Sequence, residues 1–144
     1  MKTTSETNLH WLRRFLIAFA GLIFLVTPVE LLASGHTGSP PQWIPFILCA
    51  LGLGGAVMIW RDPALRASRP VQIAFAVIGL GAAYGTLEHI EKNIAIALEV
   101  HPDLGGLALI GKALGGANPL LAPGILAIGA VLVLAAVRSA PERT

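Results

Sequence analysis

Long apolar segments separated by short polar ones dominate the chain. About 20 apolar helical residues are needed to cross the roughly 30 Å hydrocarbon core of a bilayer. Four segments reach that length: Phe15 to about Ala33, Trp43 to Trp60, Pro70 to about Leu98, and about Pro119 to Val137. The pattern predicts an all-α fold, a four-helix transmembrane bundle of up-down topology, in one domain covering residues 1–144.

Proline positions refine these segments. Proline is tolerated in the first turn of a helix, where its missing N–H costs little. Pro28 instead lies inside the first segment, so we expect it to kink that helix and free the carbonyl of Phe24, with Thr27 as a local partner. Three further prolines fall near predicted helix starts: Pro45, Pro70 and Pro119.

A shorter apolar stretch covers residues 104–114. It is too short to span a bilayer and carries one charge, so it is typical of an interfacial helix, here ended by Gly115 and Gly116. Such a helix could lie over the outer mouth of the bundle and partly shield polar groups from water. The alternative is an ordered loop.

Composition supports a membrane protein. Hydrophobic residues make up 55% of the chain and charged residues 12%, about half the average of soluble proteins, and the mean hydropathy is +0.74. The single cysteine, Cys49, excludes an intramolecular disulfide. The net charge is only +2 and there is no basic tract, so the expected partner is the lipid bilayer and not nucleic acid.

Lysine and arginine set the predicted orientation. Eight of the ten fall at one set of segment ends, whereas Lys92 and Lys112 fall at the other. By the positive-inside rule, both termini and the 61–69 loop of this multi-pass protein are predicted to be cytoplasmic. A cleaved signal peptide is the alternative at the N-terminus, although the first apolar segment is long for one. The eight are Lys2, Arg13, Arg14, Arg61, Arg66, Arg69, Arg138 and Arg143.

Histidines and carboxylates gather at the opposite, outer end. Neutral imidazole and carboxylate together suit a divalent metal such as zinc, although HExxH is absent. Tyr84, Lys92 and Asn93 extend the set as a polar network. The candidate metal ligands are His36, His89, His101, Glu30, Glu88 and Glu91.

The spacing in the third segment divides these groups between helix faces. Glu88 and Glu91 share a face with Tyr84, whereas His89 lies on the stripe Gly81–Gly85–His89–Asn93, whose two glycines allow close helix approach. A metal site would therefore need His36, His101 or Glu30 from elsewhere. The alternatives are a structural polar network and a simple Glu88–Lys92 ion pair.

Glu30 stands alone after a proline in an apolar setting. An acid within a membrane is normally functional and has a partner, and His89 and Lys92 are the expected ones. The alternative is a carboxylate at a helix end that reaches water among the lipid headgroups.

Two stretches, "GHTGSPPQWIPFIL" at 35–48 and "ANPLLAPGILAIG" at 117–129, together with the order of the four segments, carry a resemblance. The chain resembles an uncharacterised family of small bacterial four-helix integral membrane proteins, with a more distant likeness in layout to DoxX-type proteins. The resemblance implies a multi-pass, up-down bundle in the bacterial inner (plasma) membrane and supplies no catalytic residue.

No nucleophile–base pair, cofactor fingerprint or nucleotide loop is visible, so a non-enzymatic role is favoured. We expect an accessory protein or subunit whose outward-facing polar site binds a divalent metal or a partner, alone or in a homo-oligomer or membrane complex. Two alternatives remain open: a component of a quinone-linked redox system, and proton-coupled transport of a small solute by an oligomer, using Glu30 and Glu88.

Overall fold

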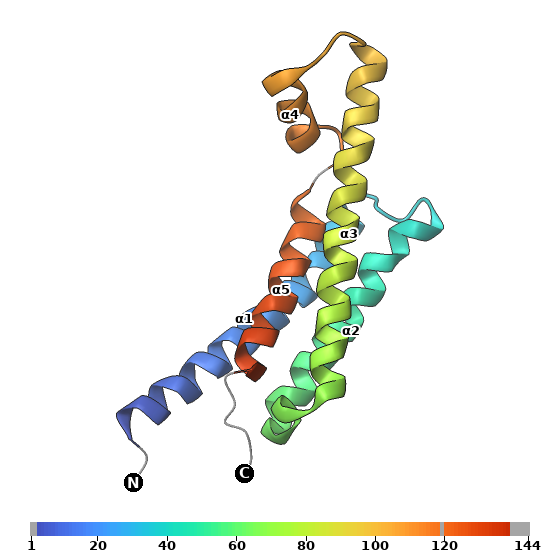
Figure 1. Cartoon of the computed structure of the whole chain (residues 1–144). Coiled ribbons are helices and arrows are strands. Elements are labelled where there is room, and N and C mark those ends of the chain that lie inside the picture. Colours follow the sequence, from blue (N-terminus) through green and yellow to red (C-terminus); the bar gives the residue numbers. More distant parts are fainter. Residues whose placement is uncertain (1–2, 119, 139–144) are drawn as a thin grey trace.

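A computed structural model describes residues 3–118 and 120–138, and they form an all-α structure (Figure 1). Four of its helices, the second counted together with η1, are long and apolar enough to cross a membrane, as predicted, while Pro119 lies outside the described residues. The elements are α1 (Thr4–Ala33), η1 (Pro40–Trp43), α2 (Ile44–Arg61), η2 (Pro63–Ala67), α3 (Arg69–Val100), α4 (Gly106–Gly115) and α5 (Leu121–Arg138), where η denotes a 3-10 helix.

The first helix is longer than its apolar segment. α1 begins at Thr4 and not near Phe15, because a capping box starts it. The Thr3 side chain accepts the Glu6 N–H at 3.3 Å, and the Glu6 carboxylate accepts the Thr3 N–H at 2.8 Å. The polar residues before the apolar segment therefore continue the helix beyond the rest of the bundle (Figure 1).

The four long helices pack around a shared core. α1 packs against α2 and α5, and α5 packs against α3, so α1 and α3 lie on opposite corners. Successive helices α2 and α3 touch much less closely than these pairs. The start of α1 and the end of α5 lie at one end of the molecule, and α4 lies at the other (Figure 1). We call the end with the start of α1 the arginine end, and the end with α4 the pocket end.

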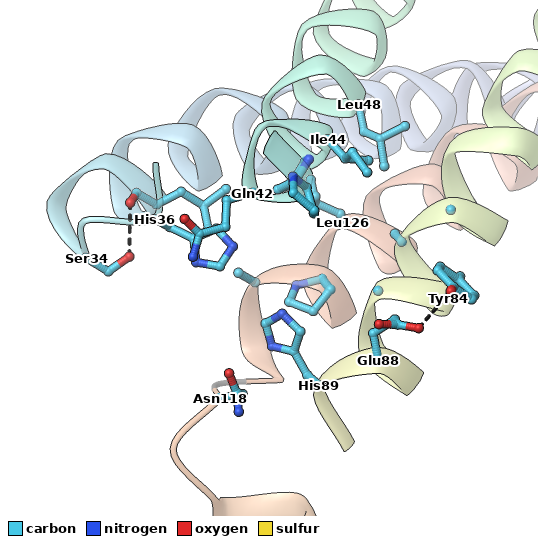
Figure 2. Close-up of a pocket in the computed structure, with 18 of the residues that line it drawn as sticks. Ser34, His36, Gln42, Ile44, Leu48, Tyr84, Glu88, His89, Asn118 and Leu126 are labelled. Carbon is cyan, nitrogen blue, oxygen red and sulfur yellow. Dashed lines mark hydrogen bonds between the residues drawn. The ribbon is translucent and has the colours of Figure 1, made fainter. Parts of the chain in front are cut away.

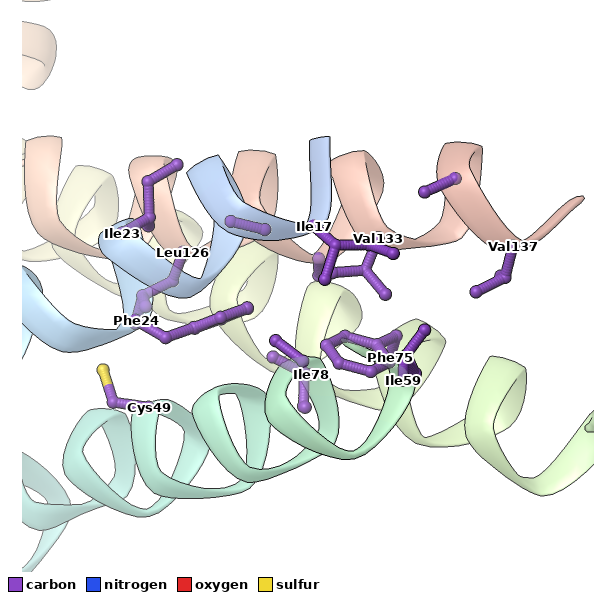
Figure 3. Close-up of a cluster of buried hydrophobic side chains, with 14 of the residues drawn as sticks. Ile17, Ile23, Phe24, Cys49, Ile59, Phe75, Ile78, Leu126, Val133 and Val137 are labelled. Carbon is purple, nitrogen blue, oxygen red and sulfur yellow. The ribbon is translucent and has the colours of Figure 1, made fainter. Parts of the chain in front are cut away.

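Two phenylalanines fill the middle of this core, and glycines make room for them. Phe24 and Phe75 lie with their ring centroids 6.2 Å apart. A Cβ at Gly52 would come within 2.6 Å of the Phe24 ring, and one at Gly55 within 2.8 Å of the Phe75 ring. The glycine-rich stretch of α2 therefore serves helix packing. Figure 3 shows the surrounding cluster, which includes Ile17, Ile23, Cys49, Ile59, Ile78, Leu126, Val133 and Val137.

The helix around Pro28 continues to Ala33. Thr27 donates its hydroxyl to the Ile23 carbonyl at 2.8 Å, so its partner is not the Phe24 carbonyl that we expected. Buried threonines often bond four residues back in this way, which satisfies the hydroxyl inside the core.

Much of the outer surface of the long helices is apolar. On α1 alone, Phe15, Phe19 and Leu22 are each about half exposed or close to it. Contiguous apolar surface of this kind is unusual on a soluble monomer. It is compatible with a multi-pass protein whose helices face lipid.

The predicted helix near 104–114 is present as α4, and a buried asparagine holds it. Asn93 of α3 is 2% exposed and donates to the carbonyls of Ala113 (3.1 Å) and Asn118 (2.9 Å). Its carbonyl oxygen accepts the Asn118 backbone N–H at 2.8 Å. A Cβ at Gly116 would lie 2.5 Å from Asn93 Cγ, so this close approach requires glycine.

Candidate functional site

A cavity of about 510 Å³ lies at the pocket end, where α1, α2, α3 and α5 meet (Figure 2). Its volume falls within the range of about 300–1,000 Å³ found for small-molecule sites. We call it the end pocket. Its polar lining side chains are Glu30, Ser34, His36, Ser39, Gln42, Tyr84, Glu88, His89, Lys92 and Asn118, and its apolar lining includes Leu31, Ile44, Leu48, Pro123 and Leu126.

A helix-ending turn places His36 at this pocket. Gly35 has φ +68°, a left-handed conformation that glycine adopts without strain. Its N–H bonds to the Leu32 carbonyl at 3.1 Å, and the His36 N–H bonds to the Leu31 carbonyl at 2.9 Å. These two bonds form a Schellman motif, which folds the chain back over the end of α1. His36 is thus held by backbone bonds and is half-buried.

Gln42 fixes the loop that follows. Its side-chain oxygen accepts the backbone N–H groups of Gly38 at 2.6 Å and Ser39 at 3.1 Å. This side chain therefore satisfies the loop backbone and ties it to η1. Figure 2 shows Gln42 beside His36 on the same wall of the pocket.

α3 supplies the opposite wall. His89 lies with its ring centroid 6.1 Å from that of His36, at an interplanar angle of 47°. Glu88 accepts a hydrogen bond from the Tyr84 hydroxyl at 2.7 Å, one helical turn away (Figure 2). The predicted separation of faces on α3 is therefore observed, because Glu88 pairs with Tyr84 while His89 turns toward His36.

The electrostatics of this pocket favour neutral His36. Burial lowers the pKa of His36, and the charges of His89 and Lys92 lower it further. Removing an imidazole from water disfavours its charged form, and nearby cations have the same effect. His36 therefore presents one donor and one acceptor nitrogen at neutral pH.

Apolar side chains form a large part of the pocket lining. A Cβ at Gly81 would lie 3.5 Å from Leu48, and one at Gly85 would lie 3.5 Å from Cβ of Pro123. The two glycines thus approach different helices, α2 and α5, at ordinary contact distances. They widen the cavity more than they force the helices together.

The structure brings together some predicted site residues and separates others. Glu30, His36, Glu88, His89, Tyr84 and Lys92 all line the end pocket. Glu91 does not line it, and His101 lies at a second hollow of about 260 Å³ beside Asn93 and Lys112. Glu30 is exposed, as in the alternative of a carboxylate at a helix end.

Two further expectations change. No residue of α4 lines the end pocket, so α4 is not its lid and docks instead against α3. Among residues 3–118 and 120–138, no group of three or more His, Cys, Asp or Glu side chains is arranged to hold a metal ion. Four polar side chains of the lining were not predicted. They lie in the short segments, η1 included, that join the long helices and show no periodic spacing: Ser34, Ser39, Gln42 and Asn118.

Comparisons with known proteins add nothing to this geometry, because no family model, curated protein or solved structure matches the chain.

Proposed function

We propose that this is a small, non-enzymatic inner-membrane protein whose end pocket binds an amphipathic small molecule. The observation that carries the proposal is one cavity lined by both apolar and polar side chains. Leu48 and Leu126 line it together with His36, His89 and Lys92. Small-molecule sites typically combine apolar walls with a few placed polar groups.

The proposed orientation places the pocket end outside the cytoplasm, with the four spans running up and down and both termini inside. The excess of lysine and arginine at the opposite end supports it. α4 would then lie in the outer interface. Its apolar residues Leu107 (86% exposed), Ile110 and Leu114 are exposed at helical spacing, which suits a helix lying on a membrane surface.

A direct test of orientation uses thiol labelling. Cys49 is buried, and replacing it with alanine removes the only native thiol. Ser39→Cys lies at the pocket end and Ser68→Cys in the 61–69 loop. A membrane-impermeant maleimide should label Ser39→Cys in intact cells, and Ser68→Cys only after permeabilisation. The reverse pattern would overturn the orientation.

A quinone-like ligand is the second, narrower candidate. α2 and α3 pack less closely than the other neighbouring helices, and both line the pocket, so an apolar tail could leave toward lipid between them. A flat headgroup with hydrogen-bond acceptors would fit between the pocket walls. Neutral His36 and the Lys92 ammonium both carry donors for such acceptors.

The test of the binding function fills the pocket. Gly85 lines it, whereas a side chain at Gly54 in α2 would meet nothing within 4 Å, so Gly54→Leu is the matched control. With a decyl-substituted benzoquinone as probe, we expect Gly85→Leu to weaken binding by about tenfold or more, a change of ~1.4 kcal/mol. Equal binding by Gly85→Leu and Gly54→Leu would remove the pocket as the site, and no binding by the native protein would remove the quinone-like ligand.

A further inference from the structure

Three arginines of α1 and η2 lie at the arginine end. Arg13 and Arg14 come from α1, and Arg66 comes from η2, the short turn that joins α2 to α3. The Arg14 guanidinium lies over the ring of Trp60, near the end of α2 that leads into η2. Burial lowers the pKa of Arg66, and the positive charges of Arg13 and Arg14 lower it further. The cluster therefore carries charge of a single sign.

The key member of this cluster is buried. Arg66 is 6% exposed, and its Nε has no hydrogen-bond partner within the described part of the chain. Nε and Nη2 of Arg13 likewise have no hydrogen-bond partner among the residues that the structure describes. Burying a charged donor without a hydrogen-bond partner is unfavourable. Donors held in this way fit best with an anion bound among them.

The fold holds Arg66 in place from both sides. Leu65 packs against the hydrophobic core, and the Gln72 side chain donates to the Arg66 carbonyl at 3.3 Å. η2 contacts α2, α3 and α5. The position of this arginine is therefore set by packing, and it does not depend on the anion that we infer.

Two carboxylates of α1 and the 61–69 loop are engaged in local caps. Asp62 accepts the Ala64 N–H at 2.9 Å and thereby begins η2, and Glu6 accepts the Thr3 N–H in the capping box of α1. These acids stabilise helix starts. Within residues 3–118 and 120–138, neither acid is paired with one of these guanidinium groups.

Aromatic side chains on the outward surface indicate the source of such an anion. The Arg14 guanidinium lies over the Trp60 ring, 4.0 Å from its centroid. Along α1, Trp11 is 65% exposed and stacks on Phe15 with ring centroids 5.5 Å apart. Tryptophan prefers the level of the lipid headgroups, so these arginines lie where lipid phosphates would be.

We infer that Arg13, Arg14 and Arg66 form a binding site for the phosphate of an anionic phospholipid at the cytoplasmic interface. Arginine is suited to this task because its planar fork can donate two hydrogen bonds to one phosphate. The inference depends on membrane insertion but not on the function of the end pocket, which lies at the other end of the molecule.

The test compares two arginines of the same loop region. Arg66→Gln and Arg69→Gln remove the same charge, but Arg69 is exposed and is not among the charges that face Arg66. The probe is phosphatidylglycerol in phosphatidylcholine nanodiscs, with bound lipid counted by native mass spectrometry. We expect Arg66→Gln to lower phosphatidylglycerol affinity by about tenfold and Arg69→Gln by less than about twofold.

A second variant covers the case in which Arg66→Gln does not fold. Arg14 is exposed, so Arg14→Gln should leave the fold intact and still weaken phosphatidylglycerol binding more than Arg69→Gln does. If Arg14→Gln, or a folded Arg66→Gln, retains the lipid as well as Arg69→Gln does, the site is overturned.

Two controls separate the lipid from other anions. Inorganic phosphate alone should not displace phosphatidylglycerol or raise Tm as the lipid does; if it matches the lipid, the site is one for free phosphate. Glu142 lies outside the described residues, and Glu142→Gln should leave lipid binding unchanged. The opposite outcome is that the native protein fails to bind the lipid while Glu142→Gln loses as much stability as Arg66→Gln. That result would assign the counter-charge to the chain itself.

Discussion

The two ends of the bundle use polar side chains in opposite ways. At the pocket end, acids, imidazoles and a lysine surround a cavity, and Tyr84 and Glu88 already bond each other. At the arginine end, guanidinium groups of one sign include buried donors without partners in the described chain. The first arrangement offers a shaped space, and the second offers unbalanced charge. We therefore expect shape to select the ligand at one end and charge at the other.

The largest effect is expected from a change in the helix core that lies between the two ends and supports both. Gly52→Leu would drive a side chain into Phe24, whereas Gly54→Leu points into open space. Overpacking of a core costs about 1–3 kcal/mol, occasionally more. Gly52→Leu should lower the free energy of unfolding by about that amount, measured by denaturant titration in detergent, and weaken ligand binding at both ends. Loss at only one end would contradict a common core.

The next effect isolates α4 from the end pocket. Gly116→Ala would push against Asn93, whereas a Cβ at Gly115 meets nothing within 4 Å. Displacing Asn93 leaves backbone groups of Ala113 and Asn118 unpaired, at a cost of about 1–3 kcal/mol. Hydrogen exchange of residues 106–115 should accelerate in Gly116→Ala and not in Gly115→Ala. α4 does not line the pocket, although Asn118 does, so probe binding there should weaken less than in Gly85→Leu. A loss as large as that in Gly85→Leu would mean that α4 shapes the pocket after all.

A smaller effect tests the electrostatics of the pocket end. The folded protein binds a proton at His36 less readily than the unfolded chain, whose imidazole titrates near 6.5. His36 therefore does not affect stability above pH 6.5. Stability falls as the pH drops from 6.5 toward the lowered pKa of His36 in the folded protein. His36→Gln should flatten the decrease in Tm between about pH 7 and about pH 5. His101→Gln, with an exposed imidazole, is the control; an equal flattening there would contradict the assignment.

The smallest effect concerns the hydrogen bond between Tyr84 and Glu88. Tyr84 is 63% exposed, so Tyr84→Phe should leave the free energy of unfolding unchanged within error. It frees a carboxylate of the end pocket, so probe affinity there should change slightly while phosphatidylglycerol binding at the arginine end stays the same. An isothermal binding series at both ends would measure this. A change at the arginine end would show that the two sites are coupled.

The helices were largely predictable because lipid-spanning segments are read from apolar length alone. The start of α1 at Thr4 was not predicted, although Thr3 and Glu6 carry the capping-box spacing. The turns before Phe15 are largely polar, so apolar length alone does not indicate them. The gathering of Glu30, His36, Glu88 and His89 followed from their similar depth. His101 was wrongly grouped with them: α3 continues to Val100, which carries His101 roughly 18 Å beyond His89 at about 1.5 Å per residue.

The rest depends on tertiary contacts that a sequence does not encode locally. Gln42 acts through loop N–H groups that only the folded connection presents. The burial of Arg66 depends on how η2 packs against α2, α3 and α5. Nothing in the sequence around this residue indicates that packing. Such contacts decide which polar side chains have partners and which remain available to a ligand.

Native mass spectrometry of the gently solubilised protein tests the central claim most directly, because the two ligands can be counted on one molecule. We expect the benzoquinone probe and phosphatidylglycerol to bind together. Gly85→Leu should lose only the probe, and Arg66→Gln should lose only the lipid. If both variants keep both ligands, or if either variant loses both while remaining folded, the bundle does not carry two separate sites.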